Sequence, residues 1–192
     1  MLIEFYLIKH SLSLRSLFQM DSSRISLRPF KLSDVDDFLI WASDDRVTRY
    51  LRWNSITAKE DALTYLEHVV IPHSWRRSIC LDDRSIGYIS IKPGSGDDDR
   101  YRARVGYAVA AEYWGQGIVT MALKLAISKV FEDMRELLVR LEALVEVENK
   151  GSQRVLEKVG FQKEGLLRKY GFCKGEIRDM FVYSFLSTDK IM

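Results

Sequence analysis

The spacing of apolar residues changes from an alternating to a helical pattern across one short turn, and this change constrains the fold more than any other feature. Residues 102–110, RARVGYAVA, alternate as a β-strand does. The turn that follows, EYWGQG at 112–117, contains two glycines. Beyond it, apolar residues recur at helical spacing, at Ile118, Met121, Leu125 and Val130. The sequence therefore predicts a strand that passes directly into a long helix.

Two further β-rich runs precede this strand. The runs WRRSICLDD (75–83) and SIGYISIK (85–92) are joined at Asp82, Asp83 and Arg84, which predicts a hairpin. The loop PGSGDDDR that follows has too much Gly, Asp and Pro for a regular element. Three antiparallel strands are the simplest account of this part of the chain.

The rest of the chain adds helices before this meander and alternating elements after it. The segment RISLRPF predicts a first strand. Two capping boxes, Ser33 with Asp36 and Thr57 with Glu60, predict the starts of two helices. After the long helix we expect a strand at 138–147, a helix at 152–159 and closing strands at 163–172 and 179–186. The fold class is α/β with a mixed, largely antiparallel sheet.

Size and charge narrow the classes of function. A chain of 192 residues with 47% apolar residues can bury one substantial core, so we expect one domain. Lys and Arg number 29 against 27 Asp and Glu, and no basic block tracks a phosphate backbone, so nucleic acid is not the expected partner. No apolar run approaches the ~18 residues of a membrane span, so we expect no membrane partner.

The cysteines and histidines argue against disulfide and metal chemistry. Cys80 and Cys173 are too few for a disulfide framework and lack the spacing of a zinc site, which favours a reducing, cytoplasmic compartment. Cys80 lies in an apolar run and is expected to be packed, whereas Cys173 near a turn is expected to be more exposed. The three histidines form no ligand pair on a helix, so no metal is expected.

The first residues are a candidate extension. Residues 1–20 are apolar and Ser-rich with Lys9 and Arg15, which is typical either of an organelle-targeting peptide or of a loosely ordered extension that leaves Met20 as a start. We therefore divide the chain into a poorly ordered extension at 1–23, one domain at 24–188 and a short tail at 189–192.

The glycine turn is the most informative chemical feature. Where a strand gives way to a helix, exposed backbone N–H groups and the positive end of the helix dipole form an anion site, and glycines allow a diphosphate to approach the main chain. The alternative is a tight turn without a ligand. The turn matches neither common nucleotide-binding motif. Ile118 follows Gly117 where a Walker loop needs Lys, and Thr120 stands where a dinucleotide fingerprint needs its third glycine.

A second segment, NKGSQRVLEKVGF at 149–161, ends a strand and opens a short helix that Gly160 is expected to cap. Lys150, Arg154 and Lys158 recur every four residues and share one helix face. That face either attracts a phosphate or is simply solvated.

Together, GYAVAAEYWGQGIVTMALK and ENKGSQRVLEKVGF resemble the GNAT superfamily, and in particular its ribosomal-protein N-terminal acetyltransferase branch. The resemblance extends from about Arg24 to Leu186, and GEIRD at 175–179 is similar to that branch as well. It implies a sheet of six to seven strands flanked by about four helices. It also implies an acetyl-CoA-dependent N-acetyltransferase that transfers the acetyl group directly to an amine, on a protein N-terminus or a small molecule, through a ternary complex.

The resemblance implies where the substrates bind. The CoA diphosphate would lie on the amides from Gly115 to Thr120 and the pantetheine arm between two splayed strands, with a backbone amide at Val109 or Ala110 polarising the thioester, a contribution of ~3 kcal/mol. The residues expected to contact CoA are Val109, Ala110, Trp114, Gly115, Gln116, Gly117, Ile118, Val119, Thr120, Asn149, Ser152, Arg154 and Lys158.

The candidate catalytic residues are Ser152, Asn149 and Glu146. Ser152 is the candidate near sulfur, and Glu146 with Glu148 could relay the proton of an amine with a pKa of ~10. The alternative for both glutamates is an exposed strand carboxylate. Tyr50 and Trp53 are the candidates for acceptor binding, although clustered aromatic residues are more often core.

Three departures from the family pattern keep a second function open. Val119 stands at a position that is usually small, Leu156 replaces the tyrosine acid of many relatives, and Arg104 replaces an acidic residue before Gly-Tyr. The alternative is therefore a catalytically weak or inactive acyl-CoA-binding regulatory domain. As partners we expect acetyl-CoA and an amine acceptor, with the protein a monomer or weak homodimer.

Overall fold

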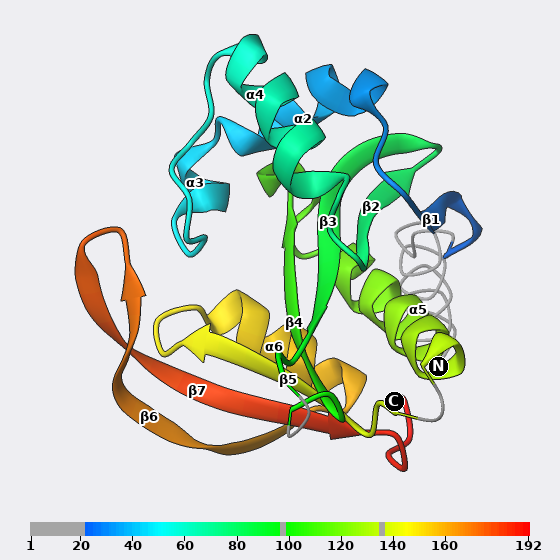
Figure 1. The fold of residues 1–192 in the computed structure, drawn as a ribbon, viewed down its shortest axis with the longest axis vertical. Coiled ribbons are helices and arrows are strands. Elements are labelled where there is room, and N and C mark those ends of the chain that lie inside the picture. Colours follow the sequence, from blue (N-terminus) through cyan, green and yellow to red (C-terminus); the bar gives the residue numbers. More distant parts are fainter. Residues whose placement is uncertain (1–21, 97–98, 135–136) are drawn as a thin grey trace, which may run out of the picture.

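The computed structural model describes residues 22–192 except 97–98 and 135–136, and shows one seven-stranded sheet with helices on both faces (Figure 1). The expected extension at 1–20 lies outside the described residues. The strands are β1 (Ile25–Arg28), β2 (Arg76–Leu81), β3 (Arg84–Pro93), β4 (Arg102–Val109), β5 (Arg140–Glu146), β6 (Gln162–Cys173) and β7 (Glu176–Leu186). The α-helices are α2 (Val35–Ala42), α3 (Asp45–Thr48), α4 (Lys59–Tyr65), α5 (Ile118–Asp133) and α6 (Lys150–Val159).

The sheet has the order β1-β2-β3-β4-β5-β7-β6, and its described pairs are antiparallel except that of β4 with β5. The predicted mixed and largely antiparallel sheet is therefore confirmed. The hairpin between β2 and β3 turns at Asp82 and Asp83, whose φ angles of 50° and 65° are both positive. Two consecutive positive φ angles match the right-handed twist of paired strands, which explains the short connection.

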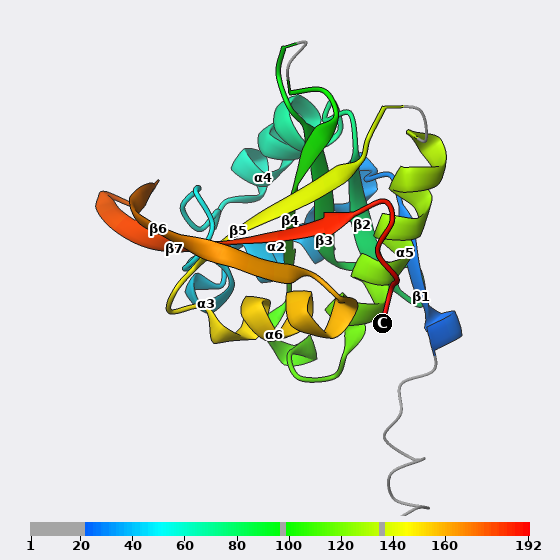
Figure 2. The ribbon, with the colours of Figure 1, turned by 90° about the horizontal axis from the view of Figure 1, so that it is seen from below.

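The helices form two layers. α5 packs on β1, β3 and β4, and α2 packs on the other face of β3. Figure 2 shows α4 above and α6 below the band formed by β5 and β7. The buried stripe of α5 consists of Ile118, Ala122, Leu123, Ala126, Ile127 and Val130. Leu125, which the helical spacing placed in this stripe, is exposed because the smaller Ala122 and Ala126 lie against the sheet instead.

The starts of the two N-terminal helices differ from the prediction. A 3-10 turn at Leu32–Asp34 precedes α2, and α4 begins after Ala58 without a side-chain cap, so the capping boxes at Ser33 and Thr57 are wrong. The Asp34 carboxylate accepts hydrogen bonds from the Lys31 N–H, at 2.8 Å, and from the Arg28 guanidinium. Asp34 is therefore the acidic residue that bonds the main chain near the start of α2. The second helix continues as a π-helical turn at Leu66–Val70 and ends before Pro72, as expected.

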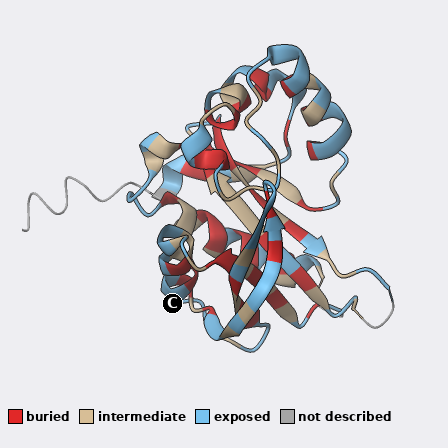
Figure 3. Ribbon diagram, turned by 90° about the vertical axis from the view of Figure 1, so that its left-hand side faces the viewer, coloured by how far each residue is buried: buried red, intermediate tan, exposed pale blue. Residues whose placement is uncertain are grey.

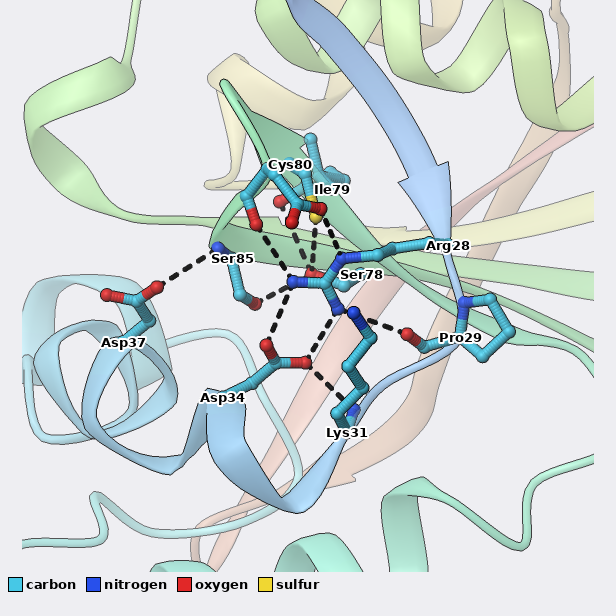
Figure 4. A network of polar contacts seen from close by, with 10 residues as sticks. Arg28, Pro29, Lys31, Asp34, Asp37, Ser78, Ile79, Cys80 and Ser85 are labelled. Atoms are coloured by element: carbon cyan, nitrogen blue, oxygen red, sulfur yellow. Dashed lines mark hydrogen bonds and ion pairs between the residues drawn. The ribbon is translucent and has the colours of Figure 1, made fainter.

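A buried ion pair fixes α2 to the sheet (Figure 4). The Arg28 guanidinium donates two hydrogen bonds to the Asp34 carboxylate, at 2.8 and 2.9 Å, and one to the Asp83 carboxylate at 2.8 Å. Burial raises the pKa of Asp34, but the hydrogen bonds from Arg28 and the Lys31 N–H outweigh burial and lower the pKa below its ordinary value. The network joins β1, the start of α2 and the β2–β3 turn, so it supports the helical layer above the sheet.

The arm is the far part of the β6–β7 hairpin, residues 167–179, which extends past the end of β5. β5 pairs with β7 only as far as Met180, whereas β6 and β7 continue to pair up to Cys173 and Glu176. The arm curves toward α3 (Figure 1). Figure 3, viewed from the side of the arm, shows buried positions in the sheet behind it and exposed positions along it.

Candidate active site

The candidate site begins with a gap between β4 and β5. Residues 102–104 of β4 lie opposite residues 140–142 of β5, and after these pairs the two strands diverge (Figure 1). β4 stays paired with β3 up to Val109, and β5 stays paired with β7 up to Glu146. The sheet therefore remains intact on either side, and only the contact between β4 and β5 opens.

The backbone of β4 directs hydrogen-bonding groups into this gap. The Ala110 N–H donates to the Ile86 C=O at 2.8 Å, which shows that even-numbered residues of β4 bond to β3. Because hydrogen bonding alternates along an antiparallel pair, the N–H groups of Tyr107 and Val109 point toward β5. The pairing of β4 with β5 ends at Arg104, so β5 does not accept from these two N–H groups. Of the two amides considered for the thioester, Ala110 is already bonded, and Val109 is available.

The glycine turn lies at the end of this strand. Gly115 and Gly117 have φ angles of 76° and 81°, and a Cβ atom at either would meet nothing within 4 Å. The first helical hydrogen bond of α5 runs from the Met121 N–H to the Gly117 C=O, so the N–H groups of residues 118–120 have no partner among the described backbone groups. The sequence prediction of a turn that exposes amides at a helix start is confirmed.

Trp114 connects the turn to β4. Its indole N–H donates to the Val109 C=O at 3.0 Å, while half of its side chain stays exposed. The Gln116 side chain donates to the Glu112 C=O at 2.8 Å. Val119 is half-buried against the core and does not fill the turn. The side chains thus stabilise the turn from outside, and the open side is lined by main chain.

The start of α6 forms the next wall. The Asn149 side chain caps the helix by accepting from the Ser152 N–H at 3.1 Å. The Tyr107 hydroxyl, which comes from β4, donates to the Ser152 C=O at 3.0 Å. This bond links β4 to the first turn of α6, the helix that follows β5. Contact of Asn149 and Ser152 with CoA stays a prediction.

The other residues of α6 separate into two faces. Leu156 is fully buried in the core, so it presents no group to the gap. Arg154 and Lys158 are exposed on the opposite face, and no carboxylate of a described residue lies within ion-pair distance of either. Their role in CoA binding stays a prediction.

Glu146 is buried, in contrast to the exposed strand carboxylate that composition favoured. Only 7% of its surface is exposed, and the Arg178 Nε lies 3.8 Å from its carboxylate. Burial and the Glu146 carboxylate together raise the pKa of the neighbouring Cys173 thiol. Glu148, two residues further, is exposed. The two glutamates considered for proton transfer thus differ in burial, and the role of Glu146 in proton transfer stays a prediction.

The segment 49–54 lies against the arm, on what we call the acceptor side of the gap. The Cys173 thiol donates to the Leu51 C=O at 3.4 Å, so the arm and this segment meet directly. Cys173 is buried by this contact, and the expectation that it is more exposed is wrong. Cys80 is fully buried in β2, as predicted.

The aromatic residues of the N-terminal half form a packed cluster. Trp53 lies 5.5 Å from Tyr65 and 6.3 Å from Trp41 between ring centroids. Tyr50 is half-buried, and the Arg49 guanidinium lies 5.3 Å from its ring centroid. Trp41 is fully buried in the core, and the half-buried Trp53 packs against the same cluster. Acceptor binding by Tyr50 and Trp53 stays a prediction.

Two classes of feature are not found in the described part of the chain. Its helices include none that is both long and apolar enough to cross a membrane. Outside the gaps at 97–98 and 135–136 and the first 21 residues, no three His, Cys, Asp or Glu side chains gather where they could hold a metal ion.

Comparison with known proteins identifies the family. Residues 24–162 match the model of the acetyltransferase (GNAT) domain. The chain belongs to the GNAT acetyltransferase family. An uncharacterized N-acetyltransferase of Bacillus licheniformis, p20, is 30% identical over 174 residues, which are 88% of this chain and 96% of p20. The N-acetyltransferase function predicted from the two motifs is thereby confirmed.

Solved GNAT structures share the fold. Mycobacterium smegmatis RimJ in complex with CoA-disulfide has a TM-score of 0.69 and 26% identity, covering 85% of this chain and 82% of RimJ. RimL, a ribosomal L7/L12 α-N-protein acetyltransferase in complex with coenzyme A, has a TM-score of 0.72 over 85% of this chain and 94% of RimL. At 19% identity, RimL shows the fold alone. The GNAT fold and the resemblance to the ribosomal-protein branch are confirmed.

Proposed function

We propose that this GNAT N-acetyltransferase transfers the acetyl group of acetyl-CoA directly to the α-amine of a polypeptide, with both substrates bound at the gap between β4 and β5. The observation that carries the proposal is the divergence of these strands after residue 104, with the unbonded Val109 amide on one wall and the buried Glu146 on the other. The two substrates would approach from opposite faces of the sheet and meet in the gap.

The residues on the helical side suit a diphosphate and an extended pantetheine arm. The amides of residues 118–120 and the positive end of α5 favour an anion, and Gly115 and Gly117 leave room for it. Tyr107 and Val109 offer N–H groups at alternate positions, which is how a strand pairs with an extended chain. The RimJ and RimL structures, which contain CoA or its disulfide, support acetyl-CoA as the donor.

The chemistry requires a hydrogen-bond donor to the developing oxyanion, a proton acceptor for the amine and a proton donor for the thiolate. The Val109 N–H would polarise the thioester carbonyl. As the amine nitrogen forms its bond to the carbonyl carbon and the C–S bond breaks, Glu146 would accept the amine proton and later release it to solvent. The Ser152 hydroxyl would pass its proton to the departing thiolate and regain one from solvent. A neutral amine is required, and an α-amine with a pKa of about 8 loses its proton more readily than an alkyl amine with a pKa of about 10.

The acceptor side suits a chain end rather than a compact small molecule. The segment 49–54 and the arm meet at Leu51 and Cys173 in front of Glu146, and both continue outward from this contact. If the amine of an acceptor reaches Glu146, the rest of the acceptor chain would therefore extend outward along these two segments. The α-N-protein acetyltransferase RimL has the same fold, which is consistent with a polypeptide acceptor.

The proposal is tested with purified protein, acetyl-CoA and matched acceptors. Thiol release and product mass are measured for peptides with a free α-amine, for the same peptides with a blocked α-amine and a lysine side chain, and for small amines. We expect acetylation of the free α-amines only. Turnover on lysine or small amines alone would contradict the polypeptide α-amine, and tight acetyl-CoA binding without turnover on any acceptor would indicate a regulatory acyl-CoA-binding domain.

A further inference from the structure

The two segments that meet at the acceptor side carry a strong local excess of positive charge. Residues 49–54 and 168–179 together contain six Lys or Arg and only two Asp or Glu, in a chain whose total net charge is +2. Both acidic residues are already engaged within the arm. Glu176 pairs with Arg178, and Asp179 accepts from the Lys169 N–H at 2.6 Å. The excess is therefore not neutralised by the segments themselves.

Three of these cations flank the contact between the segments. Arg52 follows Leu51, Lys174 follows Cys173, and the Cys173 thiol donates to the Leu51 C=O at 3.4 Å. Arg49 lies on the same segment with its guanidinium over the Tyr50 ring.

All three cations are exposed, and within the described ranges none has a carboxylate at ion-pair distance. The arginines that surround the β2–β3 turn show the opposite behaviour, because Arg28 and Arg84 are bound to Asp34 and Asp37. Cations that no carboxylate neutralises are thus available to an acidic ligand at the acceptor side.

The distance along the arm sets which part of an acceptor these cations would meet. Glu146 lies opposite Met180 of β7, and Lys174 lies six residues before Met180 at the turn of the arm. At about 3.3 Å per residue, the path along the arm from Glu146 to the turn is at most on the order of 20 Å, and the arm bends back, because the thiol of Cys173, next to Lys174, neighbours the Glu146 carboxylate. An extended peptide with its α-amine at Glu146 would therefore meet these cations within about its first six residues.

We infer that Arg49, Arg52 and Lys174 form a recognition surface for an acidic peptide segment, which follows the acetylated α-amine within about the first six residues of the acceptor. The inference rests on the proposed function and adds the chemical class of the acceptor. Charge complementarity on exposed segments acts mainly through encounter and binding, so it should appear in KM and depend on salt. Exposed ion pairs are individually weak, so the preference comes from several acting together.

The test compares three peptides that share the same N-terminal residue. Positions 3 to 6 contain Asp and Glu in the acidic peptide, Asn and Gln in the neutral peptide, and Lys in the basic peptide. We expect kcat/KM for the acidic peptide to exceed that for the neutral one by about tenfold, the order that two or three exposed ion pairs give together. The gain should lie in KM and shrink as the salt concentration rises from 0.05 to ~0.5 M. The double variant Arg52→Gln/Lys174→Gln should lose the preference and keep its activity on the neutral peptide.

A charge-matched control separates a local site from the net charge. Lys129→Gln/Lys190→Gln removes the same two charges on exposed residues outside the two segments and should keep the acidic preference. Equal kcat/KM for acidic and neutral peptides in the native protein would overturn the inference while leaving the proposed function intact. A preference lost equally in both double variants would also overturn it, as would competition by a short RNA at concentrations below the peptide KM, which would assign the surface to nucleic acid. No turnover on any peptide would instead contradict the proposed function.

Discussion

The two sides of the gap between β4 and β5 are built in different ways. The cofactor side uses main chain from one continuous stretch, in which Val109, the glycine turn and the first turn of α5 follow each other within about a dozen residues. The acceptor side brings together three distant segments, through the backbone carbonyl of Leu51 and the side chains of Glu146 and Cys173. A site made of backbone tolerates changes of side chain around it, whereas a site made of distant side chains can change its acceptor by single substitutions.

The largest effect that distinguishes the two sides is expected from Gly117→Glu. Its Cβ would have open space, but its carboxylate would stand among the amides that face the diphosphate, and its positive φ adds strain. We expect acetyl-CoA binding measured by calorimetry to be abolished, while circular dichroism shows a folded protein.

Two controls separate charge from strain and from position. Gly117→Ala keeps the strain without the charge and should lower affinity only modestly. Gly175→Glu places the same charge on a glycine with φ of 84° and open space at the turn of the arm, so acetyl-CoA affinity should not change. Unaltered affinity in Gly117→Glu would show that the diphosphate binds elsewhere.

On the acceptor side, Glu146→Gln is expected to lower kcat by about 10²- to 10⁴-fold, the range for removing a general base. The substitution keeps the shape of the buried side chain, and acetyl-CoA affinity should stay within about twofold, because cofactor-side amides are untouched. Glu148→Gln is the matched control, since Glu148 is exposed and should contribute little. Equal kcat values in the two variants would remove Glu146 from the mechanism.

The contact that the Arg28–Asp34 pair makes between β1 and the start of α2 is tested by Arg28→Ala. Removing one partner of the buried pair leaves the Asp34 carboxylate without its cation and should lower the free energy of unfolding by about 3–5 kcal/mol. Arg24→Ala, which breaks the exposed pair with Asp82, should lower the stability much less, because solvent screens an exposed pair. Urea unfolding of both variants measures the difference, and equal losses would contradict the buried role.

The same pair predicts a pH dependence. The pKa of Asp34 is lower in the folded protein than its ordinary value of 3.8, so its contribution to stability is present above that value and is lost as the pH falls through the folded pKa. The stability difference between native protein and Arg28→Ala should therefore be full near neutral pH and shrink in strong acid. A difference that stays constant from neutral pH into strong acid would contradict this assignment.

The smallest expected effect is that of Ser152→Ala. A hydrogen bond to a developing thiolate contributes about 1.5 kcal/mol or more, so kcat should fall about tenfold, with acetyl-CoA affinity little changed. The helix cap survives, because Asn149 bonds the Ser152 N–H and not its hydroxyl. An unaltered kcat would assign thiolate protonation to solvent or to another residue.

The sequence predicts features built from one continuous stretch better than features built from distant segments. The Asp82–Asp83 hairpin and the glycine turn depend on local backbone conformation, and both were predictable from residue type. The capping box at Ser33 failed because the Asp34 carboxylate, and not the Ser33 side chain, bonds the main chain at this helix start, where it accepts from the Lys31 N–H and from Arg28. The burial of Glu146 and Cys173 depends on the arm meeting Leu51, which is 122 residues away from Cys173.

The central claim is tested most directly by the amide resonances of β4 and α5 during a titration with coenzyme A, recorded by NMR on ¹⁵N-labelled protein. We expect the largest shifts at Tyr107, Val109 and residues 118–120, whose N–H groups face the proposed ligand, and smaller shifts at Ala110, whose N–H stays bonded to Ile86. Saturable binding that leaves Val109 and residues 118–120 unshifted while other amides move would contradict the account.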